Sequence, residues 1–147
     1  MDLKIKENNN GGDLYFENGD VLITSEVYNQ PYLAHFGGNK EAVTADYVEG
    51  EEREDYWANE LFLPEKERFD SYFEKMLHET ELSSSGRIKL EQAATDDLEY
   101  LDDFAERESS VTIPTVDSVK LSDSFQEGQN RAFQYVWQEA KDEILVE

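Results

Sequence analysis

The sequence contains no cysteine, only three prolines and two histidines, and no long apolar run. Without cysteine there is no disulfide, thiolate metal site or cysteine nucleophile, and a reducing compartment is compatible with the chain. A membrane helix needs about 20 mostly apolar residues, so we expect no membrane span. Residues 1–6 lack the apolar segment of a signal peptide, so no leader is expected there. These absences turn attention to charge and to apolar periodicity.

Basic residues are scarce: 13 Lys and Arg face 35 Asp and Glu, a formal net charge of −22. The acids cluster between Glu41 and Glu65, with nine acids against one base, and between Asp96 and Glu108, with seven against one. Such a field repels nucleic acid and anionic membranes. Two interpretations remain open. The acids either solvate the surface, or they dock on a basic partner, with mimicry of DNA charge as the extreme case.

The chain has 147 residues, 38% of them hydrophobic and 12% aromatic, which is enough for one globular domain. We expect a single domain over 1–147, with a flexible lead-in at 1–12 and a frayed tail at 139–147. No internal repeat is evident.

A tight hairpin is predicted within Asp13–Thr24, because two short apolar runs flank Asn18-Gly19. That dipeptide tolerates the positive φ angles of a type I′ turn. Residues 31–36 then predict a short helix that ends at Gly37, with Pro31 in its first turn. Residues 42–48 suggest a strand, followed by a polar loop that leads to Tyr56-Trp57.

Two amphipathic helices are predicted next. The first begins at Pro64 and carries its apolar stripe at i, i+3, i+4, i+7 and i+8, that is at Phe69, Tyr72, Phe73, Met76 and Leu77. After Ser83-Ser-Ser-Gly86, the second helix presents Leu90, Ala94, Leu98 and Leu101, with Ala105 continuing the line. The acids between 96 and 103 lie mostly off that line. The pair is expected to cover one face of a small sheet.

The apolar period changes to two in the C-terminal part, where Val111 and Ile113, then Val119 and Leu121, alternate with polar residues. Pro114 interrupts this pattern and suits an edge strand. A turn is predicted at 127–130. Residues 131–138 fit either a strand or a helix, and their aromatic density favours a strand. The expected fold class is α+β, with an N-terminal β-hairpin and C-terminal strands packed on a helix pair.

No catalytic motif is present. His35 lies in an aromatic short helix and is interpreted as a packed residue, and His78 as a surface residue near a helix C-terminus. Two isolated histidines give no zinc-site spacing. The serines at 83–85 lack G-x-S-x-G, and Gly37-Gly38 lacks the lysine of a P-loop. We therefore expect no enzymatic activity, no cofactor, no metal and no small-molecule substrate.

The segment GGDLYFENGDVLIT and the order of the later elements resemble the baseplate-wedge and sheath-initiator family of contractile phage tails. This family comprises the Mu-like wedge proteins, related to the lysozyme-like baseplate subunit. The matching pieces are Asp13–Thr24, Tyr32–Phe36, Tyr56–Trp57, Ser85–Leu101 and Val111–Leu121. The likeness spans most of the chain but lies in pattern and order. The Glu-Pro-Arg motif of the sheath-initiator branch is absent, and Arg131–Glu147 extends beyond the family pattern.

The resemblance implies a structural subunit, located in the virion baseplate and in the host cytoplasm during assembly. It would bind other wedge and sheath subunits through their basic extended arms, by strand addition to a sheet edge. The predicted partner-binding residues are Val111, Ile113, Val116, Val119 and Leu121. The alternatives are an acidic DNA mimic, or other binder, that blocks a host nucleic-acid-binding protein, and a peptidoglycan hydrolase.

Overall fold

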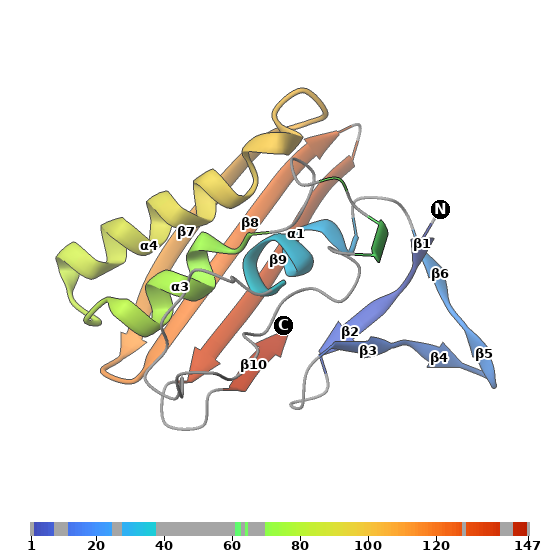
Figure 1. Ribbon diagram of the computed structural model, residues 1–147, viewed down its shortest axis with the longest axis horizontal. Helices are drawn as coiled ribbons and strands as arrows, with labels where there is room; N and C mark the ends of the chain where they lie inside the picture. The colour runs from blue at the N-terminus through green and yellow to red at the C-terminus, as the bar shows by residue number, and fades with distance from the viewer. Residues whose placement is uncertain are drawn as a thin grey trace.

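The computed structural model describes residues 2–7, 12–24, 28–37, 61–62, 64, 70–127, 129–138 and 143–146. The expected strand at 42–48, Tyr56-Trp57 and Phe69 lie outside the described residues. The fold is α+β, as predicted, with helices packed on a sheet (Figure 1). Each part of it can be traced to a local feature of the sequence.

The main sheet has four antiparallel strands in the order β10–β9–β8–β7. Their bounds are β7 (Glu106–Thr115), β8 (Ser118–Glu127), β9 (Gln129–Gln138) and β10 (Glu143–Val146). The prediction of a strand at 131–138 is therefore confirmed. Of the turn predicted at 127–130, Glu127 and Gln129 form the last pair of the β8–β9 ladder, and residue 128 lies outside the described residues. Pro114 lies where the β7–β8 register shifts, between Thr112 and Thr115. Residues 143–146, expected to be a frayed tail, instead pair with β9.

Three helices cover one face of this sheet: α1 (Gln30–Phe36), α3 (Tyr72–Glu79) and α4 (Ser84–Asp97) (Figure 1). A short 3₁₀ turn, η2 (Glu99–Leu101), follows α4. The Ser83 hydroxyl caps α4 by accepting from the Gly86 N–H at 3.1 Å. Glycine is required at position 86, because a Cβ there would collide with the carbonyl oxygen of Glu81.

The core lies between the helices and the sheet. Its main cluster joins both predicted helices to three strands and comprises Phe73, Leu77, Leu90, Ala94, Val111, Val119, Leu121, Tyr135 and Trp137. A second cluster comprises Ala34, Leu98, Leu101, Ala105 and Phe125. All five residues of the apolar line predicted for the second helix are buried. Helix α4 ends at Asp97, however, so only Leu90 and Ala94 lie on it, and the others follow in its C-cap, in η2 and in the loop after η2. On the first predicted helix, Tyr72 is not part of the core, because 48% of the residue is exposed to solvent.

Helix α3 begins later than its apolar stripe suggested. Pro64, Asp70 and Ser71 are not helical, and Ser71 has extended backbone angles. The Ser71 hydroxyl accepts from the Gly37 N–H, and the carboxylate of Asp97, on α4, accepts from the N–H groups of Tyr72 and Phe73. The helix starts where a distant carboxylate supplies its cap.

The N-terminal strands form a small unit beside the main sheet, which Figure 1 shows as a triangle with one ladder at each corner. We call it the three-armed unit. Its arms are the antiparallel ladders β1–β6 (Asp2–Leu3, Ile23–Thr24), β2–β3 (Ile5–Glu7, Gly12–Leu14) and β4–β5 (Phe16–Glu17, Asp20–Val21). The predicted turn is confirmed, with φ of 53° at Asn18 and 85° at Gly19. Residues 2–7, expected to be a flexible lead-in, instead supply two of the strands.

The arms meet at Lys4, Tyr15 and Leu22, which lie between consecutive strands. Their backbones close a ring of hydrogen bonds. Lys4 N–H donates to the Leu22 carbonyl at 2.8 Å, Leu22 N–H to Tyr15 at 2.9 Å, and Tyr15 N–H to Lys4 at 2.8 Å. Each of these residues therefore belongs to two arms at once.

A short repeat underlies this unit. Aspartate followed by apolar, any and apolar residues occurs at Asp2–Ile5, Asp13–Phe16 and Asp20–Ile23. In each copy the aspartate Oδ1 accepts from the next backbone N–H, at 2.8, 2.7 and 2.9 Å respectively. The expectation of no internal repeat is wrong for this segment, because four residues at unequal spacing leave too weak a pattern to detect.

Leu98→Ala should lower the free energy of unfolding by about 2–5 kcal/mol, because Leu98 is fully buried and its truncation leaves a cavity. Ile88→Ala, on α4 and 60% exposed, is the matched control and should change stability little. Urea unfolding followed by circular dichroism measures both. Equal effects of the two variants would show that α4 packs through a different face.

Candidate functional site

The five predicted partner-binding residues occupy different environments. Val111, Val119 and Leu121 are core residues, each 1% exposed, whereas Ile113 is half-buried. Val116, in the turn between β7 and β8, is 89% exposed. Three of the five side chains are therefore engaged in packing and are not accessible from the surface. What the strand can offer a partner is its backbone.

Strand β7 is one of the two edge strands of the main sheet in the described part of the chain, and β10 is the other. The Val111 N–H and C=O point away from β8, since they bind side chains of α4. Along a strand, the N–H and C=O groups of alternate residues point toward and away from the paired strand. The backbone groups of Ser109 and Arg107 therefore point away from β8 as well. A ten-residue edge of this kind is a template for strand addition.

Helix α4 partly covers this edge. Glu91 Oε2 accepts from Val111 N–H at 3.0 Å, and Arg87 donates to the Val111 carbonyl at 3.5 Å. The two side chains also form an i,i+4 ion pair at 3.1 Å. We call this pair the edge cap. It fills the middle of the edge with charged groups, which is how natural sheets prevent unwanted pairing.

A charged cluster is buried beneath the helices. His35 on α1 lies between Asp97 on α4, 3.1 Å from Nδ1, and Asp123 on β8, 2.8 Å from Nε2. These three side chains are at most 1% exposed. Asp123 also accepts from the Ser109 hydroxyl at 2.8 Å. When both acids are ionised, only an imidazolium satisfies both bonds, because a carboxylate only accepts and the imidazolium donates from both nitrogens.

Burial opposes the charge on His35, but the two carboxylates, Asp123 foremost, outweigh it and raise the pKa of the imidazole to about 9. Burial also raises the pKa of Asp97, against the opposing effect of His35 and of two backbone N–H groups. The imidazolium therefore persists at neutral pH. Because a substrate cannot reach these groups, the cluster serves the structure.

The packed role predicted for His35 is confirmed, but its two buried partners were missed. Asp97 was expected to lie off the apolar face of its helix, and it is buried instead. Asp123 continues the inward series of Val119 and Leu121 on β8. For Asp123, an acid at an inward position of the strand pattern was the available signal, and for Asp97 the predicted apolar line gave none.

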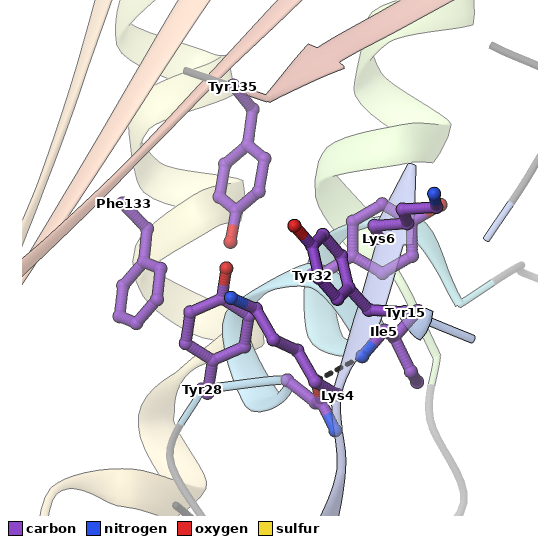
Figure 2. Close-up of a pocket in the computed structure, with 9 residues that line it drawn as sticks. Lys4, Ile5, Lys6, Tyr15, Tyr28, Tyr32, Phe133 and Tyr135 are labelled. Atoms are coloured by element: carbon purple, nitrogen blue, oxygen red, sulfur yellow. Dashed lines mark hydrogen bonds between the residues drawn. The ribbon is translucent and has the colours of Figure 1, made fainter. Parts of the chain in front are cut away.

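A cavity of about 200 Å³ separates the three-armed unit from α1 and β9. It is lined by Lys4, Ile5, Lys6, Tyr15, Tyr28, Asn29, Tyr32, Phe133 and Tyr135 (Figure 2). The Lys4 ammonium lies 4.5 Å from the ring centroid of Tyr28 and 4.9 Å from that of Tyr15. Burial, with smaller effects of Asp123 and Tyr28, raises the pKa of Tyr135, so its hydroxyl stays protonated. The cavity offers contacts but no acid–base pair.

Within the described ranges, no group of three His, Asp or Glu side chains could hold a metal ion. None of the helices described there has the length and apolar character needed to cross a membrane. Comparison with protein-family models, with curated proteins and with solved structures found no match.

The buried cluster should make stability fall at alkaline pH. The pKa of His35 is raised from 6.5 to about 9, so its contribution is fully present below pH 6.5 and is lost as pH rises through 9. We expect a loss of about 3 kcal/mol in unfolding free energy over that window, measured by urea unfolding. His35→Gln should cost about 3–5 kcal/mol at neutral pH and flatten the profile. His78→Gln should retain it. A flat wild-type profile would refute a buried imidazolium.

The edge cap should suppress self-association. Glu91→Ala removes the acceptor of Val111 N–H and opens the edge, so we expect more dimer and larger species at equal concentration by sedimentation velocity. Gln92→Ala, at an exposed position beside it, should remain like wild type. A Glu91→Ala variant as monomeric as wild type would show that the ion pair does not guard the edge.

Proposed function

We propose that this protein is a non-enzymatic assembly subunit of a phage-like contractile tail baseplate, and that it holds a wedge or sheath subunit by strand addition to β7. The observation that carries the proposal is the outer edge of β7, a ten-residue strand that pairs only with β8 among the described residues. Backbone hydrogen bonds at such an edge give affinity, and alternate side-chain contacts give register.

The order of elements supports the same assignment. An N-terminal hairpin, a short helix, a helix pair and terminal strands follow one another along the chain, as the resemblance to baseplate-wedge proteins implies. Such a subunit works in the virion, after assembly in the host cytoplasm, and requires no cofactor.

Charge on the strand selects the partner. Glu106 and Glu108 are exposed on β7, and like charges would meet if two copies paired edge to edge. A strand that carries Lys or Arg would meet them favourably. Association should weaken as salt rises, because exposed charges are screened over about 8 Å at physiological ionic strength.

The chemistry available in the described residues argues against an enzyme. The most perturbed acid–base groups, His35 and Asp97, are buried and bound to one another. Burial raises the pKa of Tyr135 in the cavity, so its hydroxyl stays protonated. A hydrolase needs a carboxylate of raised pKa in an open cleft. The proposal accordingly includes no substrate and no nucleic acid.

Ser109→Pro should abolish binding of the neighbouring wedge or sheath subunit. Proline removes the outward N–H of Ser109 but leaves the inward ladder to β8 intact. Ser109→Ala is the matched control, since both variants lose the hydroxyl bond to Asp123 and only the proline variant loses the N–H. Binding is measured by calorimetry with the purified subunits encoded beside this protein, at low and high salt.

The two variants must first show equal melting temperatures. Binding that is lost in Ser109→Pro and kept in Ser109→Ala supports strand addition. If both variants bind like wild type, with the same salt dependence, β7 is not the docking edge.

A further inference from the structure

The three-armed unit carries a closed ring of apolar side chains on one face. Successive side chains of a strand alternate between faces, and directly paired residues share one. The register pairs Leu3 with Ile23, Ile5 with Leu14, and Phe16 with Val21. Leu3 and Ile5 are two positions apart along the chain, as are Leu14 and Phe16, and Val21 and Ile23. The three pairs therefore follow one another around the unit without a break. The ring, called here the apolar ring, is Leu3, Ile5, Leu14, Phe16, Val21 and Ile23.

Half of the apolar ring is open to solvent. Leu3 is 46% exposed, Phe16 58% and Ile23 57%, and the other three are half-buried. No position of the ring is polar, although the chain as a whole has 33% charged residues. A contiguous apolar surface on a soluble domain marks an interaction site more often than scattered exposed residues do.

The opposite face of the unit is fixed to the rest of the molecule. Lys4, which alternates with ring residues, places its ammonium over Tyr28 in the cavity (Figure 2). Asn29 is 1% exposed and joins the unit to α1: its side chain donates to the Leu3 carbonyl and accepts from Ile5 N–H. With that face engaged, the apolar ring is held facing outward.

The negative charge of the chain indicates which kind of partner can bind the apolar ring. Asp2, Asp13, Glu17 and Asp20 alternate with ring residues and so lie on the other face of the unit, where they are exposed, on a chain of net charge −22. A second copy would bring like charges together, and an anionic membrane would be repelled. We propose that the apolar ring docks on a partner protein whose surface is apolar at its centre and carries Lys or Arg at its margin. This surface is separate from β7 and does not depend on the strand-addition proposal.

The test uses the full chain and a defined probe, a peptide of alternating leucine and lysine. A second peptide, with alanine for each leucine, separates apolar docking from attraction to the overall charge. The protein variants are Phe16→Ser combined with Ile23→Ser, and Ile88→Ser on α4 as a control that removes an exposed apolar residue elsewhere. Because serine weakens strands, Ile23→Thr is included to keep the β-branch. Melting temperatures verify the folding of each variant, and calorimetry measures binding.

We expect the leucine peptide to bind the wild type and Ile88→Ser equally, and the double variant at least tenfold more weakly. Ile23→Thr should bind weakly too, and the alanine peptide should bind every protein weakly. Equal affinity of wild type and the double variant for the leucine peptide would overturn the proposal. So would self-association, or binding to anionic vesicles, that the double variant abolishes, because the occupant would then be a second copy or a membrane.

Discussion

The described core is organised around an imidazolium held between two carboxylates. His35, Asp97 and Asp123 come from α1, α4 and β8, and Asp97 also caps the first turn of α3. Removing any one member leaves a charge without its partner in a medium that solvates it poorly. Well-packed apolar residues in the same space can be equally stable in other proteins. The particular contribution of these three side chains is therefore that they fix the relative positions of the elements that carry them.

Helix α1 is held in place by contacts at both of its ends. Seven residues are too few for a helix to be stable alone. Asn29 holds its beginning to the three-armed unit, and His35 holds its last turn to α4 and β8. The helix thus connects the three-armed unit to the main sheet, which also meet where β2 contacts β10. Its position sets how the apolar ring is presented relative to the main sheet.

Local patterns predicted much of this fold. Asn18-Gly19 predicted its turn, and the spacing of Leu90, Ala94 and Leu98 predicted the packed face of α4, because periodicity records which side is buried. The acid cluster was hidden by composition, since two more carboxylates among 35 resembled surface residues. The start of α3 and the three-armed unit depend on partners far along the chain. Of the predicted binding residues, Val116 is exposed, and β7 offers mainly its backbone.

The ring of hydrogen bonds at Lys4, Tyr15 and Leu22 has a consequence for how the unit opens. Each arm has only two or three residue pairs, and a two-stranded ladder of that size is not stable by itself. Since every junction residue serves two arms, opening one arm removes a support from each of the others. The three arms should therefore open together as one cooperative unit, and their amide protons should exchange with solvent at a common rate set by that single event.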